Sequence, residues 1–123
     1  MKKYLIIILV LIITSCKSNP PSIEIIAEDY VKLVLEIGQY DNTFVDAYFG
    51  PEEWKLTEPK SETLPLDNFV QRANTLISQC DALLVSDNPN LEIARINMLK
   101  KQLIAVRTKT EMIGGKMYSF DEE

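Results

Sequence analysis

Apolar residues recur at alternating three- and four-residue spacings in three segments, which is the pattern of side chains on one face of an α-helix. The first helix is expected to begin after Ser22, its N-cap, and to stop at Gly38. The second follows Pro65, with Asp67 as its expected N-cap, and the third spans residues 91–113. The three apolar stripes are Ile23, Ile26, Tyr30, Leu33 and Ile37; Phe69, Ala73, Leu76, Cys80 and Leu83; and Ile96, Leu99, Leu103, Val106, Thr110 and Ile113.

Helices with one apolar face bury that face against one another. The short "SDNPN" turn, in which Asn88 would cap the third helix and Pro89 would begin it, makes the second and third helices antiparallel. Gly114, in a left-handed conformation, is expected to end the third helix. Four charged residues on the other faces of that helix are expected to be solvated: Lys100, Lys101, Arg107 and Glu111. The sequence therefore predicts an all-α fold, a small helical bundle of three main helices.

Residues 41–65, between the first two helices, form an irregular aromatic and acidic loop. Its aromatic residues are Phe44, Tyr48, Phe49 and Trp54. The "GPEEW" stretch is typical of a one-turn helix. We expect the aromatic side chains to fold back as a lid on one end of the bundle, with the acidic side chains in water. Alternatively, Tyr48, Phe49 and Trp54 would form an exposed patch that binds a partner.

The amino terminus has the pattern of a bacterial lipoprotein signal. Two lysines precede an apolar run over residues 4–13, which as a helix is roughly 15 Å long, about half the hydrocarbon thickness of a membrane. The run therefore indicates a signal peptide and no membrane span. The following "ITSC" resembles the lipobox, which implies that residues 1–15 are the signal peptide and that Cys16 is lipidated. Residues 16–22 are then the lipidated cysteine and a polar tether.

A lipid on Cys16 would hold the chain on a membrane without crossing it. In lipoproteins an aspartate directly after the lipidated cysteine favours retention in the inner membrane. Lys17 stands there, so we expect a lipid-anchored protein of the bacterial cell envelope, on the outer membrane and facing the periplasm. Lipidation would leave Cys80 without a disulfide partner. Because Cys80 falls on an apolar stripe, we expect a small buried hydrophobe and no reactive thiol.

Charge and composition restrict the chemistry. The chain has 13 basic and 18 acidic residues, and removing Lys2 and Lys3 gives 11 − 18 = −7, which argues against nucleic-acid binding. It has no histidine, which excludes a Ser-His-Asp triad and histidine-containing zinc sites. The acidic residues of the 41–65 loop do not follow EF-hand spacing. We expect no metal, no cofactor and no catalytic residue.

An enzymatic alternative would need a pair of carboxylates, either Glu28 with Asp29 or Glu52 with Glu53. Neighbouring residues on a helix do not face each other, so such a pair is poorly placed to share one substrate. The chain is therefore expected not to be an enzyme.

Two stretches carry a family resemblance: "YVKLVLEIGQYDNTFVDAYFGPEEW" at residues 30–54 and "LKKQLIAVRTKTEMIGGKMYSFDEE" at residues 99–123. They resemble the amino-terminal region of long, uncharacterised bacterial proteins similar to DUF885-type zinc hydrolases. The histidine motif of that family lies far downstream and has no counterpart here, so the resemblance implies no catalytic residue in this chain. It implies a helical scaffold beside the catalytic part of longer relatives.

Ser119 and Glu122 have the spacing of a capping box, which predicts the start of a further helix. Residues 23–123 would then form a helical domain that is incomplete at its carboxyl end, either a fragment of a longer protein or a short relative. The leading expectation is a membrane-anchored, non-catalytic scaffold domain. The alternative is a stand-alone interaction lipoprotein that binds an envelope protein through the 41–54 loop.

Overall fold

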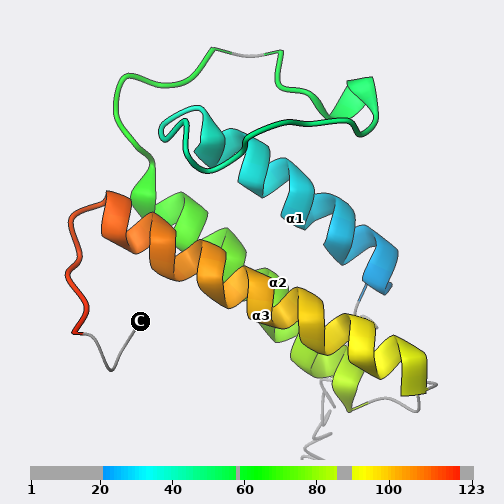
Figure 1. The fold of residues 1–123 in the computed structure, drawn as a ribbon. Helices are drawn as coiled ribbons and strands as arrows, with labels where there is room; N and C mark the ends of the chain where they lie inside the picture. Colours follow the sequence, from blue (N-terminus) through cyan, green and yellow to red (C-terminus); the bar gives the residue numbers. More distant parts are fainter. Residues whose placement is uncertain (1–20, 58, 86–89, 120–123) are drawn as a thin grey trace, which may run out of the picture.

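The computed structural model describes residues 21–57, 59–85 and 90–119. Its elements are α1 (Ile23–Gly38), the short 3₁₀-helix η1 (Glu52–Trp54), α2 (Leu66–Leu84) and α3 (Asn90–Ile113) (Figure 1). The described residues contain no strand, and the prediction of a small all-α bundle is confirmed. The signal peptide, Cys16, the cap at Asn88 and Pro89, and Glu122 of the capping box lie outside the described residues.

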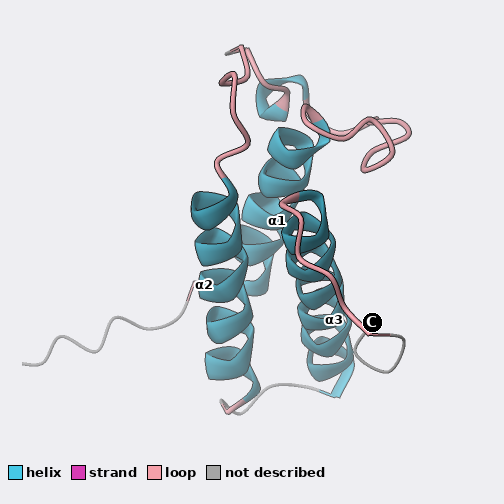
Figure 2. Cartoon of the chain, turned by 90° about the vertical axis from the view of Figure 1, so that its left-hand side faces the viewer, coloured by secondary structure: helices cyan, strands magenta, loops and turns pink. Residues whose placement is uncertain are grey.

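The three helices form an up-down-up bundle. α2 and α3 are antiparallel and share the largest helix–helix interface, whereas α1 contacts α2 more than it contacts α3 (Figure 2). α1 and α3 run in the same direction (Figure 1). The interface between α1 and α3 is the smallest of the three, which leaves that side of the bundle the most open.

The hydrophobic core lies on the three predicted stripes. Its buried residues are Ile23, Ile26, Leu33 and Ile37 of α1, Phe69, Ala73, Leu76 and Cys80 of α2, and Ile96, Leu99, Leu103 and Val106 of α3. Tyr30, Leu83 and Ile113, the remaining apolar members, are partly buried at its edge. Burying each large aliphatic or aromatic side chain contributes about 1.5–3 kcal/mol, so these stripes hold the bundle together.

Thr110 and Cys80, two stripe residues that carry a hydroxyl and a thiol group, are buried in the core. Thr110 is buried, and its Oγ1 donates a hydrogen bond to the Val106 carbonyl at 2.7 Å, so the hydroxyl is not left unsatisfied. Cys80 is buried, and burial raises the pKa of its thiol. The expectation that Cys80 packs as a small hydrophobe is confirmed.

The helix ends agree with the sequence at some points and correct it at others. α1 begins after Ser22 and ends at Gly38, as expected. α2 begins at Leu66 with Pro65 at the N-cap, so the assignment of Asp67 as N-cap is wrong. Asp67 lies in the first turn, where its negative charge interacts favourably with the positive end of the helix dipole.

The left-handed residue after α3 is Gly115, with φ of 95°, and the expectation for Gly114 is wrong. The Gly115 N–H donates to the Met112 carbonyl and the Lys116 N–H to the Glu111 carbonyl, both at 2.9 Å. These two bonds define a Schellman motif, in which the left-handed position comes one residue later than the sequence suggested. Gly114 has a different role, because a Cβ there would collide with the Leu66 side chain.

Candidate interaction surface

The segment between α1 and α2 lies along α1 instead of covering one end of the bundle. From the end of α1 it runs back beside that helix to η1 and then returns to the start of α2 (Figure 1). Trp54 reaches the middle of α1, where the Lys32 Nζ lies 6.0 Å from the centre of its ring. The predicted lid is therefore wrong for Trp54. It holds in part for Phe44, which is partly buried against the core.

Hydrogen bonds near the end of α1 fix this segment. The Asp41 carboxylate accepts bonds from the Thr43 N–H at 2.9 Å and the Thr43 Oγ1 at 2.7 Å. These bonds, and more weakly the charge of Lys109, lower the pKa of Asp41. The Tyr40 hydroxyl accepts a hydrogen bond from the Ser61 N–H at 3.1 Å, which holds the part of the loop that leads to α2 near the end of α1.

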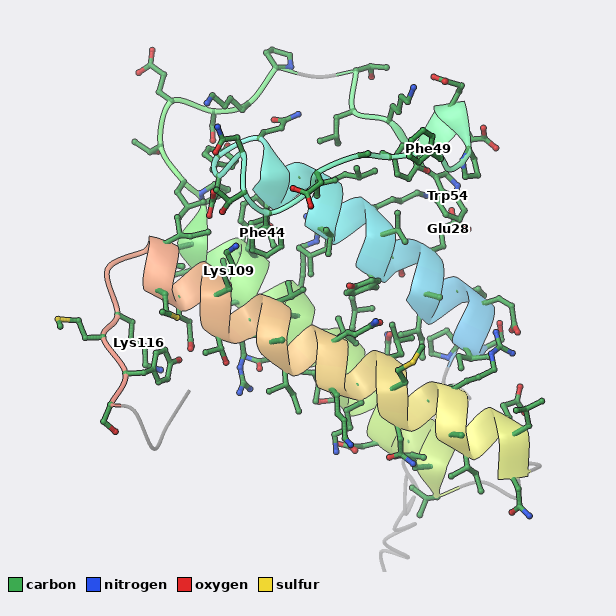
Figure 3. All side chains as sticks on the ribbon, in the orientation of Figure 1. Glu28, Phe44, Phe49, Trp54, Lys109 and Lys116 are labelled. Carbon is green, nitrogen blue, oxygen red and sulfur yellow. The ribbon has the colours of Figure 1, made fainter. Side chains whose placement is uncertain are left out.

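The three predicted interaction residues differ in exposure. Phe49, which is labelled in Figure 3, is 96% exposed, whereas Tyr48 and Trp54 are partly buried. The Tyr48 hydroxyl donates to the Pro51 carbonyl at 3.0 Å, and its ring lies so close to Gly50 that a Cβ there would clash. Of the three, only Phe49 presents nearly its whole side chain to solvent.

A second apolar stripe, which the sequence analysis did not identify, lies on the outer face of α3. Leu91 is 76% exposed, Met98 60%, Met112 43% and Ile104 37%. Leu91, Met98, Ala105 and Met112 follow one another at seven-residue intervals, so they lie nearly in line along the helix. The seven-residue spacing indicates this stripe in the sequence, but the lysines between its residues are typical of a solvated polar face.

Two hollows flank this stripe. A groove of about 230 Å³ lies between α1 and α3 and is lined by Tyr30, Val34, Phe44, Gln102, Ala105, Val106 and Lys109. A wider, shallow hollow of about 750 Å³ is lined by Lys101, Ile104, Ala105, Thr108, Lys109, Met112 and Ile113. Ala105 and Lys109 belong to both, so the two hollows form one continuous surface, which we call the α1–α3 groove. No carboxylate is among the described residues that line it.

The charged residues that line this groove are basic, whereas the whole chain is acidic. The chain has a net charge of −5, but α3 has five basic residues and two acidic ones, 5 − 2 = +3. Lys109 stands at the groove with its Nζ 5.1 Å from the centre of the Phe44 ring, 3.2 Å from the Thr43 Oγ1 and 4.0 Å from the Asp41 carboxylate (Figure 3). Lys101 has no ion-pair partner among the described residues.

Other charged residues of α3 form local contacts. Lys100 pairs with Asp81 at 2.5 Å and Arg107 donates to the Asn74 Oδ1 at 3.0 Å, so both link α3 to α2. Glu111, which was expected to be solvated, is largely covered, because the Tyr118 hydroxyl donates to its carboxylate and Lys116 pairs with it at 3.1 Å. The Tyr118 bond is the main cause that lowers the pKa of Glu111, followed by Lys116.

The carboxylates that could have formed catalytic or metal sites are dispersed. Glu28 pairs with Lys32 at 2.6 Å and Glu52 with Lys55 at 2.7 Å. Within residues 21–57, 59–85 and 90–119, no three acidic or cysteine side chains gather in a way that could hold a metal ion. In the same ranges, no helix is both long enough and apolar enough to span a bilayer.

The fold and surface thus define a class, a small all-α bundle with an uncovered apolar groove. Comparisons with protein-family models, with curated proteins and with solved structures found no match to this chain. The resemblance to DUF885-type proteins therefore rests on the residues quoted for it.

Proposed function

We propose that this chain is a lipid-anchored, non-catalytic scaffold domain of the bacterial envelope, and that it acts by packing against another protein. The lipobox-like "ITSC" supports the anchor at Cys16. The absence of histidine from all 123 residues supports a role without chemistry of its own. The main support for binding to another protein is the uncovered apolar stripe on α3.

A surface helix of a small bundle normally has one apolar face, which it buries. α3 has two, because Leu99 and Leu103 are buried in the core while Met98 and Ile104 remain exposed on other sides. Covering one large apolar side chain contributes about 1.5–3 kcal/mol, so a partner that covers several of them gains enough to offset part of the entropy lost on association. The exposed stripe is thus a reason for this domain to hold a partner.

The family resemblance fits the same role. If residues 30–54 and 99–123 are related to the amino-terminal region of DUF885-like hydrolases, this bundle corresponds to a part that supports a catalytic domain. The zinc chemistry would then belong to the longer relatives, and the scaffold surface would be what this chain shares with them.

The second candidate is binding through the loop that precedes α2. The observation in its favour is the 96% exposure of Phe49, a large aromatic side chain of the kind that anchors protein interfaces. Tyr48 and Trp54 would contribute less, because both are partly buried.

The anchor and the two surfaces can be tested in cells. Cys16→Ala is expected to move the chain from the membrane fraction to the soluble fraction, and a chain that stays on the membrane would contradict lipid anchoring. A photoreactive amino acid in place of Met98 or Met112 is expected to give a discrete crosslink, whereas one in place of Val70, on α2, gives none. Crosslinks only from position 49 would favour the loop, and crosslinks from none of these positions would contradict the scaffold role.

A further inference from the structure

We infer that the α1–α3 groove is the binding site for a fourth helix, an acidic amphipathic helix of a partner protein. This inference rests on the proposed scaffold role and names the kind of partner. It concerns the side of the bundle where the helices share the least contact. A fourth helix there would contact both α1 and α3 and would lie diagonally across from α2, as in a four-helix bundle.

The walls of the groove have the chemistry of a helix–helix interface. Tyr30 and Val34 of α1 stand on one side, Gln102 and Ala105 of α3 on the other, and the buried Val106 forms the floor. Helix axes pack 8–10 Å apart depending on the side chains at the contact. The small side chain of Ala105, shared by both hollows, allows a partner helix to approach closely at that point.

The part of the stripe from Met98 to Met112, with Ala105 at its middle, sets the length of the partner helix. Residues 98–112 extend over about 21 Å at 1.5 Å per residue. A partner of about 15 residues, roughly four turns, matches that length. Met98 and Met112 stand at its two ends, and flexible methionine side chains adapt to a partner surface.

The charge of the groove selects an acidic partner. Lys101 and Lys109 line it, no described carboxylate does, and the rest of the chain is acidic. Glutamates beside the apolar face of a docked helix would pair with these lysines. Lys109 has a side chain that is 45% exposed despite its contact with Asp41, and Lys101 is exposed with no ion-pair partner among the described residues.

A second copy of this chain fits the groove poorly. Two α3 helices docked antiparallel about Ala105 would bring Lys101 of one copy near Lys109 of the other, which repels. α1 has four acidic residues and one basic residue, but four of the five residues of its apolar stripe are already buried in its own core. The observations therefore favour a partner protein.

The test uses the full lipid-anchored chain in phosphatidylcholine nanodiscs and two synthetic 18-residue peptides. The first has leucine at helical three- and four-residue spacing and glutamate elsewhere, and the second has lysine in place of every glutamate. Binding is measured by fluorescence anisotropy of labelled peptide, with empty nanodiscs subtracted. We expect the acidic peptide to bind at least tenfold more tightly than the basic one.

Variants then locate the site. Ala105→Glu should weaken the acidic peptide at least tenfold, and Lys101→Glu should reduce the preference for it at least threefold. Ser78→Glu, a matched change on the exposed face of α2, should alter binding less than twofold. Circular dichroism confirms that each variant is folded, so a loss of binding is not a loss of structure.

Four results would overturn the inference. Three of them are no binding of the acidic peptide, equal binding of both peptides, and unchanged binding by Ala105→Glu. A dimer in sedimentation that Ala105→Glu dissociates would show a second copy in the groove and would equally overturn it. The anchoring and crosslinking experiments can succeed in each of these cases, so failure here is distinguishable from failure of the scaffold role.

Discussion

Leu103 and Ile104 are neighbours in the sequence that face opposite environments, and replacing each in turn tests the described packing of α3. Leu103 is 0% exposed in the core, whereas Ile104 is 37% exposed beside the groove. We expect Leu103→Ala to destabilise the bundle strongly and Ile104→Gln to have little effect. The same helix thus provides the perturbation and its control.

The magnitude follows from burial. Leu103→Ala removes buried methyl and methylene groups and leaves a cavity, and such changes cost about 2–5 kcal/mol. Small domains have about 5–15 kcal/mol of total stability, so the loss is a large fraction of it. For a domain of this size, about 4–8 °C per kcal/mol corresponds to a fall in Tm of roughly 8–40 °C. Ile104→Gln, at a partly exposed position, should cost below about 1 kcal/mol.

Urea unfolding followed by circular dichroism measures both values. Every buried core residue lies between Ile23 and Val106, so a chain that begins at Lys17 keeps the whole described core. The slope of the free energy of unfolding against urea concentration should be the same for each variant as for the parent chain. An unchanged slope means that the variant changes stability and does not change the compactness of the unfolded state. If Ile104→Gln costs as much as Leu103→Ala, the outer face of α3 is covered in the isolated chain, and the argument for an open groove is refuted.

Three further predictions concern contacts outside the core. Glu36 accepts two hydrogen bonds from Arg72, at 2.5 and 2.8 Å, but both side chains are about one-third exposed. Glu36→Gln should therefore lower the free energy of unfolding in urea by about 0.5–1 kcal/mol. A loss above about 2 kcal/mol would contradict this expectation. Gly115→Ala places a side chain at φ of 95° and should cost about 1 kcal/mol, whereas an unchanged midpoint would mean that the turn can rearrange. The pKa of Glu111 is lowered in the folded chain, chiefly by the Tyr118 hydroxyl, so this contact stabilises at pH above the ordinary glutamate pKa and is lost as the pH falls through the lowered one. Tyr118→Phe should therefore lower Tm at neutral pH and not in acid, and an equal loss at both would show that the hydroxyl contact is not responsible.

The sequence predicted the core well because a helical stripe is a local pattern. Leu33, Leu76 and Leu103 each lie inside a stripe, and each is buried. The order of burial within a helix follows from the 3.6-residue period alone, without knowledge of the neighbouring helix. Leu83 and Ile113, the last residues of their stripes, are only partly covered.

The path of the loop could not be predicted in the same way, because contacts distant in the sequence fix it. Trp54 meets Lys32 on α1, and Tyr40 meets Ser61 across 21 residues. No local pattern encodes such pairs. The end of α3 at Ile113 was predicted correctly, and the left-handed residue after it was wrong by only one position. Either glycine of the pair can adopt the left-handed conformation, and the backbone hydrogen bonds select Gly115.

The groove was missed for a third reason. Lys101 and Lys109 interrupt the outer stripe of α3, so a search for one apolar face per helix stops at the core stripe. The regular interval from Leu91 to Met112 is visible in the sequence, but its exposure depends on where α1 and α2 pack. That information comes only from the assembled bundle.

The burial of Cys80 has a consequence for how this chain would mature. In the proposed envelope location, oxidants can react with the Cys80 thiol only while the chain is unfolded, because folding buries the sulfur. Helical bundles, whose contacts are mostly close in sequence, fold in microseconds to milliseconds, and disulfide formation takes seconds to hours. Folding would therefore enclose the sulfur of Cys80 long before it could react, and a slowly folding variant would be the one to accumulate oxidised or crosslinked chains.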